Sequence, residues 1–456
     1  MGRALITDLY ELTMAASYLR RGMTAPATFS LYVRGLPSDR GFLVAAGIDD
    51  CLDYLEGFRF EDQDLEWLAH HGFSLETVDA LRDLRFTGDV EAVEEGRVIL
   101  AGEPLIEVTA PLPEAQLVET SLLNHVTFQT AVATKATRCR LAAGPIELVD
   151  FALRRTHGTE AGMAVARLSA IAGFAGTSNV EAARQLGLAA SGTMAHSYVE
   201  AFPTETEAFR AFAEDLPPPH TFLVDTYDTL SGVETAARVV ADLGLTDRVA
   251  VRLDSGDVDK LARAARDILD RRGLSHVRIF VSGSLDEYLL HDLASSGTPI
   301  DAAGVGTRFG TVADAPYVDS VYKLVELDGR PVMKLSPGKE TLPGAKQIWR
   351  TEGRCDVLAR RCEPPPDSAE GLLVPVFRGG RRLRGHSTVA QAKARVERDL
   401  SWLPAGARRI RTPEVPEPVL SAALEEITAS TRAAAERGVS RVHDGCHGSS
   451  SPSTPR

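Results

Sequence analysis

The sequence predicts an α/β protein whose larger part is a (β/α) barrel. Between residues 145 and 310, short apolar runs rich in Val, Ile, Leu and Ala recur, and amphipathic helical stretches separate them. Short buried strands that alternate with helices indicate a parallel sheet. Each predicted strand also becomes polar or glycine-rich at its carboxyl end, and in a parallel barrel those ends form the rim that carries chemistry.

Six runs in this region are clear strand candidates. They are 146–153, 188–195, 221–228, 248–257, 277–284 and 300–307. The segment 170–179 is a candidate for a seventh, and seven or eight strands would close a barrel. Amphipathic stretches at 233–244 and 258–273 have the spacing of helices that cover the outside of such a sheet.

The segments before and after this region are less regular. Strands are expected at 29–37, 41–47, 89–96 and 103–111, helices at 48–58, 112–144 and 419–438, and a hairpin at 321–335. The stretch 112–144 is either one long helix or two in series. The two strands at 29–37 and 41–47 flank a turn at 38–40, and the polar residues at the carboxyl end predict a disordered tail.

Composition and charge limit the possible partners and compartment. The 456 residues carry a formal net charge of −13, which argues against general binding to nucleic acids or to anionic membranes. No run of about 18 apolar residues occurs, so no membrane span is expected. The cysteines have no CxxC spacing and are interpreted as reduced thiols of a cytoplasmic protein, without an assigned role; they lie at 51, 139, 355, 362 and 446.

The last two strand ends suggest a binding site for an anion. Gly283 and Ser284 precede a helix expected at 285–297, and Gly306 and Thr307 follow the next strand. Backbone N–H groups freed by glycine, together with the amino end of a helix, form a cradle for a phosphate. Arginines at the same rim could supply the charge-assisted hydrogen bonds: Arg154, Arg155, Arg252 and Arg308.

Two carboxylates bracket a glycine at the end of another strand. Asp254 and Asp257 could bind ribose hydroxyls or, through water, a magnesium ion, which prefers oxygen ligands. The alternative for Asp257 is a cap on the helix that begins near residue 258. Asp225 and Asp228 allow the same two interpretations, and no metal site made by protein side chains alone is expected.

Eight sequence blocks together resemble the nicotinate phosphoribosyltransferase family. In chain order they are LITDLYELTM, FALRRTHG, GFAGTSNVEAARQLG, SGTMAHSYVEAF, VDTYDTLSGV, VRLDSGD, GVGTRFGT and VYKLVEL. The resemblance extends from about residue 5 to 350. It implies a type II fold, in which an N-terminal α/β sandwich, completed by C-terminal residues, packs on an irregular (β/α) barrel.

This resemblance also implies an activity and a division of the chain. Nicotinate and 5-phosphoribosyl 1-diphosphate would give nicotinate mononucleotide and pyrophosphate, with magnesium as cofactor, ATP hydrolysis coupled to the reaction, and a homodimer with shared active sites. The implied parts are the sandwich domain (1–125), the barrel domain (126–325), a segment that returns to the N-terminal domain (326–442) and the tail (443–456).

Site residues transfer from the family by their matching motifs. His196 in GTMAHS matches a histidine that ATP phosphorylates, and with Arg252 and Asp254 it is expected to be catalytic. The residues expected to bind nicotinate are Tyr10, which would stack on the pyridine ring, Thr193, Arg154 and Arg252. The residues expected to bind phosphoribosyl diphosphate are Thr307, Gly306, Gly283, Ser284 and Arg155.

Four other interpretations remain open at this point. A nicotinamide phosphoribosyltransferase shares the architecture, but Arg252 suits an acid better than an amide. A quinolinate phosphoribosyltransferase would be shorter and would lack the histidine linked to ATP. A barrel lyase acting on a phosphosugar would want a lysine at a strand end, and the six ends contain none. A binding protein without catalysis would leave the polar rim without a purpose.

Overall fold

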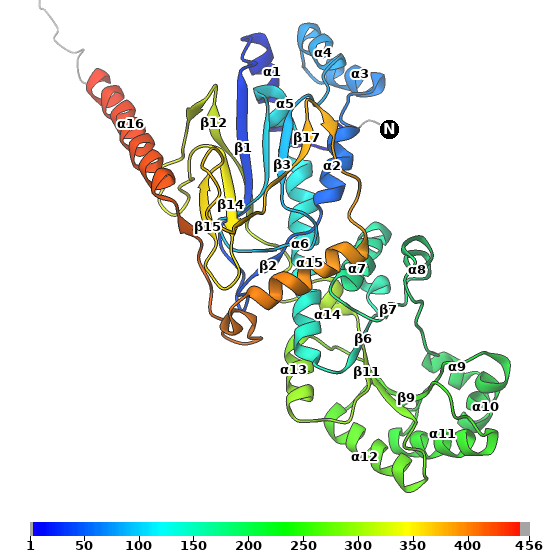
Figure 1. The fold of residues 1–456 in the computed structure, drawn as a ribbon. Coiled ribbons are helices and arrows are strands. Elements are labelled where there is room, and N and C mark those ends of the chain that lie inside the picture. The colour runs from blue at the N-terminus through cyan, green and yellow to red at the C-terminus, as the bar shows by residue number, and fades with distance from the viewer. Residues whose placement is uncertain (1–2, 447–456) are drawn as a thin grey trace, which may run out of the picture.

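The fold of residues 3–446, which a computed structural model describes, is a mixed α/β arrangement (Figure 1). Two sheets organise it: a six-stranded parallel sheet and a seven-stranded antiparallel sheet. Buried side chains from both form one continuous apolar core. Among the described residues, no helix combines the length and the apolar character that crossing a membrane requires.

The parallel sheet has the strand order β7-β6-β11-β10-β9-β8. Its strands are β6 (Glu147–Asp150), β7 (Gly176–Thr177), β8 (His220–Leu223), β9 (Val249–Leu253), β10 (Arg278–Val281) and β11 (Ala302–Val305). The helical elements between them are η1 (Leu153–Arg155), α7 (Thr159–Ile171), α8 (Val180–Leu186), α9 (His196–Glu200), α10 (Glu205–Asp215), α11 (Thr229–Leu243), α12 (Val258–Arg271), α13 (Glu287–Ser295) and α14 (Thr307–Gly310).

Five of the six strand candidates are confirmed, and the prediction for 188–195 was wrong. There only Ala190 pairs, through a single bridge to Thr177, whereas the candidate at 170–179 forms β7. The segment contains Ser191 and Gly192, which have low strand propensity, and the side chain of Arg252 contacts the residues that follow them. Among the described residues, the parallel sheet is therefore open and curled, with β7 at one edge and β8 at the other.

The parallel sheet curls around a small apolar cluster. Val149, Ala250, Phe280 and Ala302 form it, with the half-buried ring of Phe151 packed against them. A Cβ at Gly304 would lie 2.5 Å from the Phe151 ring, so only glycine leaves room for that ring. This cluster joins side chains from β6, β9, β10 and β11.

The antiparallel sheet combines strands from both ends of the chain, in the order β13-β12-β1-β5-β3-β17-β18. Its strands are β1 (Pro26–Val33), β3 (Asp89–Ala92), β5 (Pro104–Pro111), β12 (Ser320–Leu327), β13 (Arg330–Pro331), β17 (Val374–Arg378) and β18 (Arg381–Arg382). Two smaller sheets contain β2 (Leu43–Val44), β4 (Val98–Ile99), β14 (Lys346–Arg350), β15 (Val357–Arg360), β16 (Glu370–Gly371) and β19 (Val419–Leu420).

The remaining helices lie around this sheet and connect it to the parallel one. They are α1 (Leu9–Arg20), α2 (Ile48–Glu56), α3 (Asp62–His70), α4 (Leu75–Arg82), α5 (Leu112–Leu117), α6 (Glu119–Ala143), α15 (Val389–Trp402) and α16 (Ala422–Cys446), with the short turn η2 (Ala405–Arg408). Stretch 112–144 is thus two helices in series. In Figure 1, α16 projects away from the rest of the chain; it includes residues 443–446 of the expected tail, whose remainder lies outside the described residues.

The strands on either side of the turn at 38–40 do not pair with each other. β1 pairs with β5 and β12, whereas β2 pairs with β4. The expected hairpin at 321–335 is confirmed as the antiparallel pair β12 and β13. Local alternation identified these strands, but their partners come from distant segments.

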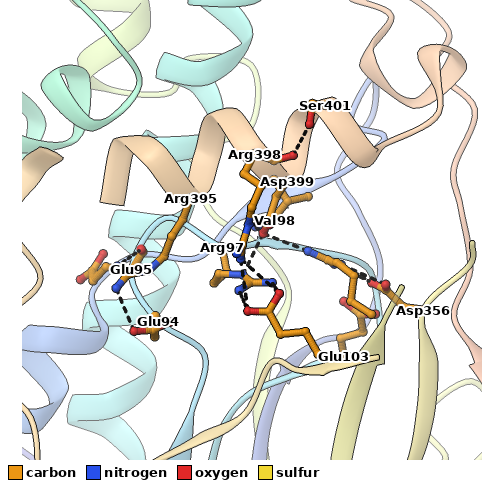
Figure 2. A network of polar contacts seen from close by, with 12 residues as sticks. Glu94, Glu95, Arg97, Val98, Glu103, Asp356, Arg395, Arg398, Asp399 and Ser401 are labelled. Atoms are coloured by element: carbon orange, nitrogen blue, oxygen red, sulfur yellow. Dashed lines mark hydrogen bonds and ion pairs between the residues drawn. The ribbon is translucent and has the colours of Figure 1, made fainter. Parts of the chain in front are cut away.

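A buried network of charged side chains attaches α15 to the N-terminal strands (Figure 2). Asp399, whose side chain is fully buried, accepts hydrogen bonds from Arg97 Nε and Arg350 Nη1, each over 2.9 Å. Arg97 also donates to Glu370, and Arg350 to Asp356. Because removing one member would leave an uncompensated buried charge, this network holds residues about 300 positions apart in one arrangement.

Candidate active site

Four of the expected site residues lie together at the carboxyl end of β9. Arg252 is the fourth residue of that strand, Asp254 follows it, His196 begins α9, and Thr193 lies three residues earlier. Arg252 Nη1 donates to Thr193 Oγ1 and Nη2 donates to Asp254 Oδ1, both over 2.7 Å. His196 Nε2 lies 3.8 Å from the other carboxylate oxygen of Asp254.

The guanidinium of Arg252 is almost fully occupied. Besides those two contacts, Nε donates to Ser282 Oγ over 2.8 Å and Nη1 to the Met194 carbonyl over 3.3 Å. A guanidinium has five N–H donors, so these contacts leave one N–H on Nη2. The group also lies 5.6 Å from the centre of the Phe151 ring. In this arrangement a carboxylate could take one N–H of Arg252, and a bidentate contact would require an existing bond to open.

Asp254 is held in its ionised form by its neighbours. Although burial opposes ionisation, the hydroxyl of Ser282 and the charge of Arg252 lower the pKa of the Asp254 carboxyl, with a smaller contribution from His196. The hydroxyl of Ser282, a buried residue, donates to the same carboxylate. Asp254 therefore presents a fixed negative charge to the imidazole of His196.

The other ring nitrogen of His196 contacts Thr226. His196 Nδ1 and Thr226 Oγ1 are 3.2 Å apart, and the imidazole side chain is 42% exposed. If Nδ1–H donates a hydrogen bond to the threonine oxygen, the lone pair is on Nε2, the nitrogen that faces Asp254. The ring is thus oriented by contacts on both sides, while one face remains open to a ligand.

Three residues of this cluster had no settled role in the sequence. Thr226 and Ser282 follow the ends of β8 and β10, where only position at a strand end could have marked them. Asp225 allowed two interpretations, and its Oδ2 accepts from the Asp254 amide over 3.1 Å and from Ser255 Oγ over 2.5 Å. The other oxygen of Asp225, Oδ1, is buried without a hydrogen-bond partner.

The expected phosphate cradle has a backbone that favours glycine. Gly283 has φ of 93°, and a Cβ there would lie 2.3 Å from the Asp254 carbonyl oxygen. Ser284 also has a positive φ, 53°, and a Cβ at Gly306 would lie 2.9 Å from the Phe151 carbonyl oxygen. These segments consequently adjoin the Asp254 cluster, and Thr307 is exposed at the beginning of α14.

The two arginines after β6 are exposed on the same side of the sheet as this cradle. Arg154 and Arg155 lie on η1, which packs against α14. Neither side chain forms a hydrogen bond or ion pair within residues 3–446. Arg308, by contrast, pairs with Asp286 over 2.8 Å. Arg154 and Arg155 are thus available cations at this edge.

Tyr10 lies apart from this cluster. It is 47% exposed on α1 and lines an open cavity of about 500 Å³. The wall on the other side of that cavity is the segment 316–320, and α6 contributes Asn124 and Phe128. Burial and the nearby Glu119 raise the pKa of the Tyr10 hydroxyl. No direct contact joins Tyr10 to Arg252, Asp254 or His196 in the described chain.

Side-chain donors for a metal are sparse in this region. Within residues 3–446, no group of three His, Cys, Asp or Glu side chains has a geometry that could hold a metal ion. Asp257 caps α12 by accepting from the Lys260 amide, and it also pairs with the Lys260 ammonium over 2.8 Å, which confirms its expected capping role. Two carboxylate oxygens of the cluster accept no hydrogen bond from the described residues: Asp225 Oδ1, which is buried, and Asp254 Oδ2.

The fold and the site define a class of protein before any comparison. It is an α/β protein with a basic and carboxylate cluster, beside two glycine segments, at the carboxyl edge of a curled parallel sheet. Family models describe the same chain: the N-terminal domain of nicotinate phosphoribosyltransferase (NAPRTase) matches residues 5–127, and the NAPRTase family matches residues 146–347. The chain belongs to the nicotinate phosphoribosyltransferase family.

Named relatives agree with the family models. The chain is 48% identical over 390 residues to nicotinate phosphoribosyltransferase pncB2 of Mycobacterium tuberculosis, with 84% of each chain covered. It is 42% identical over 362 residues to the nicotinate phosphoribosyltransferase of Bacillus subtilis, which covers 76% of this chain and 73% of that one.

Solved structures show a similar fold. The crystal structure of human nicotinic acid phosphoribosyltransferase has a TM-score of 0.80 and 30% identity, covering 93% of this chain and 99% of the human one. The nicotinate-nucleotide pyrophosphorylase of Pyrococcus furiosus has a TM-score of 0.74 and 25% identity, covering 87% and 95%.

Proposed function

We propose that the cluster at the end of β9 transfers a phosphoribosyl group to nicotinate, giving nicotinate mononucleotide and pyrophosphate. One observation carries this proposal: Arg252, Asp254 and His196 meet beside two glycine segments at a single sheet edge. The family and its named relatives supply the reaction type. The pyridine nitrogen already has a lone pair, so the residues act by positioning and by electrostatics, and no general base is required.

Nicotinate and phosphoribosyl diphosphate could both bind at this edge of the sheet. Thr193 and the remaining Nη2 N–H of Arg252 would bind the nicotinate carboxylate, and the positive charge of Arg252 favours an acid over an amide. The glycine segments would receive phosphate oxygens, assisted by the cations that have no other partner. The residues proposed for phosphoribosyl diphosphate are Gly283, Ser284, Gly306, Thr307, Arg154 and Arg155, and Arg154 would also contact nicotinate.

His196 is proposed as the acceptor of the γ-phosphoryl group of ATP. Nε2 attacks the γ-phosphorus, the bond to the bridging oxygen breaks, and ADP leaves; water later hydrolyses the phosphoimidazole. The contact of Nδ1 with Thr226 would keep the lone pair on Nε2, and Asp254 would stabilise the positive charge that develops on the ring. The 42% exposure of the side chain leaves room for this transfer.

Magnesium is proposed to enter bound to the diphosphate, where it neutralises the charge that leaves with pyrophosphate. The unpartnered oxygen of Asp225 and the adjacent carboxylate of Asp254 fit a contact through water. Asp257 is less suited, because its carboxylate already pairs with Lys260.

Tyr10 is proposed to act in the site of a second copy. Tyr10 is partly exposed, and the cavity that it lines includes none of Arg252, Asp254 and His196 of the same chain. Its ring could therefore stack on the pyridine ring in a neighbouring subunit. A cytoplasmic homodimer is therefore expected. Size-exclusion chromatography with light scattering tests the dimer: a strictly monomeric active enzyme would contradict it.

We also retain the division of the chain as a proposal. The sandwich domain would be 1–125 with 326–442 returning to it, which the pairing of β3 with β17 supports. The irregular barrel would be 126–325, in which the bridge at Ala190 extends the curl of the sheet beyond β7. The tail would begin near residue 443.

A single set of assays tests the activity. The protein is incubated with phosphoribosyl diphosphate, magnesium and nicotinate, nicotinamide or quinolinate, with and without ATP, and the mononucleotide is measured. Product from nicotinate, increased by ATP, is expected. Product from nicotinamide alone would favour the nicotinamide enzyme instead. The variant His196→Ala should keep a basal rate and lose the ATP stimulation; undiminished stimulation would exclude His196 as phosphate acceptor.

A further inference from the structure

A cluster of charged residues, buried except for the partly exposed Asp314, adjoins the proposed phosphate cradle. At its centre is Lys135 on α6, which is 1% exposed. Its Nζ contacts Asp314 Oδ1 over 2.7 Å and also forms an ion pair with Glu287. Arg40 Nη2 lies 2.9 Å from Asp314 Oδ2, and Arg138 Nε lies 3.1 Å from Glu287 Oε1. None of these five residues belongs to the proposed catalytic machinery.

The two carboxylates of the cluster belong to the two halves of the cradle. Glu287 is fully buried and is the first residue of α13, directly after the segment that contains Gly283 and Ser284. Its neighbour Asp286 caps the same helix by accepting from the amides of Tyr288 and Leu289. Because the amino end of α13 is fixed by these contacts, the position of Glu287 determines where the Gly283 segment lies.

Asp314 belongs to the other half of the cradle, four residues beyond the end of α14. It follows α14, whose first residue is Thr307 and whose N-cap is Gly306. The chain between them is compact, since the amide of Ala313 donates to the carbonyl of Arg308 over 3.1 Å. Although burial opposes ionisation, Arg40 and Lys135 lower the pKa of Asp314 to about 2, so this carboxylate is charged whenever the protein is folded near neutral pH.

We propose that Lys135 is a positioning residue that joins Glu287 to Asp314 and thereby sets the separation of the two glycine segments that receive phosphoribosyl diphosphate. One ammonium group contacts both carboxylates, and α6 is a long, buried and therefore rigid support for it. Arg40 also contacts both carboxylates, but its contact with Glu287 is long, at 3.6 Å. Without the ammonium of Lys135, the separation of the two carboxylates is held less firmly, and the cradle widens. The inference rests on the assignment of phosphate binding to the glycine segments.

A matched pair of variants tests this role. Lys135→Met removes the ammonium and keeps most of the apolar stem. Lys346→Met is the control, because Lys346 is also buried, at 3% exposure, and pairs with the buried Glu107 over 3.3 Å in a different sheet. Both variants should lose thermal stability, since each removes one cationic partner of a buried carboxylate, while Arg138 stays with Glu287 and Arg361 with Glu107. Stability alone therefore does not distinguish the two.

The distinguishing measurement is the Michaelis constant for each substrate. For Lys135→Met we expect the KM for phosphoribosyl diphosphate to rise by about tenfold or more, with a smaller change in the KM for nicotinate. For Lys346→Met both constants should stay within about twofold of wild type. Calorimetric titration with phosphoribosyl diphosphate and magnesium, in the absence of nicotinate, should show the same loss of affinity for Lys135→Met alone.

Equal Michaelis constants in the two variants would overturn the inference. If Lys135→Met does not fold, Asp314→Asn keeps the shape of the side chain, removes one of the two charged contacts and should raise the same constant in the same direction; an unchanged constant would again overturn it. Wild type and Lys346→Met must both form nicotinate mononucleotide. If neither does, the proposed function fails, and that result is separate from the role of Lys135.

Discussion

Replacing Arg252 by Lys tests whether the geometry of the guanidinium, beyond its charge, is required. The structure shows three side-chain acceptors around it, Ser282, Thr193 and Asp254, within 2.7–2.8 Å. A lysine ammonium keeps the charge but cannot reach all three. Losing the bond to charged Asp254 costs about 1.5–3 kcal/mol and losing a bond to a neutral hydroxyl about 0.5–1.5 kcal/mol. The sum, about 2–4.5 kcal/mol, lowers kcat/KM for nicotinate roughly 30- to 2000-fold.

The assay is an initial-rate measurement of nicotinate mononucleotide formation at varied nicotinate and saturating phosphoribosyl diphosphate. The matched control is Arg210→Lys, because Arg210 forms an exposed pair with Asp242 on the outside of the sheet. Such surface pairs contribute about 0–1 kcal/mol, so kcat/KM should stay within about twofold. Thermal unfolding of both variants establishes that they are folded. A value within about threefold of wild type for Arg252→Lys would refute the assigned role of the guanidinium.

Three further changes probe other parts of the structure. Thr226→Val removes one hydrogen bond of about 0.5–1.5 kcal/mol, so ATP stimulation should fall about two- to tenfold while the rate without ATP is kept; unchanged stimulation would exclude the tautomer argument. Gly283→Ala should raise the KM for phosphoribosyl diphosphate about tenfold or more, because the Cβ would lie 2.3 Å from the Asp254 carbonyl; Gly297→Ala, where the space is open, is the control, and equal effects would count against the cradle. Burial raises the pKa of Glu103, so its contribution to stability is complete below the ordinary carboxyl pKa and is lost as pH rises toward the raised value. Glu103→Gln should therefore increase the free energy of unfolding near neutral pH and flatten its pH dependence in denaturant titrations, and a decrease at neutral pH would contradict this.

Much of the fold could be predicted from local patterns. Five of the six apolar runs that predicted strands in the parallel region are strands in the structure. Such runs are informative because a strand that is buried on both faces must be apolar along its length. The polar strand ends pointed to the edge where Arg252, Asp254 and His196 meet. The motif blocks pointed to the family, and the family models agree. The failure at 188–195 has a tertiary cause, since Arg252 contacts Thr193 and Met194 from another strand.

By itself the sequence determined which residue types stand at the strand ends and which family the chain resembles. Only the tertiary structure decided which atoms meet: Ser282 joins Arg252 from 30 residues away, and Thr193 from 59. It also decided that Arg252 keeps one free N–H and that Lys135 contacts both Glu287 and Asp314. The physical reason is that the spacing of side chains along one segment determines which face of a helix or strand they occupy. Contacts between segments depend instead on strand register and helix packing.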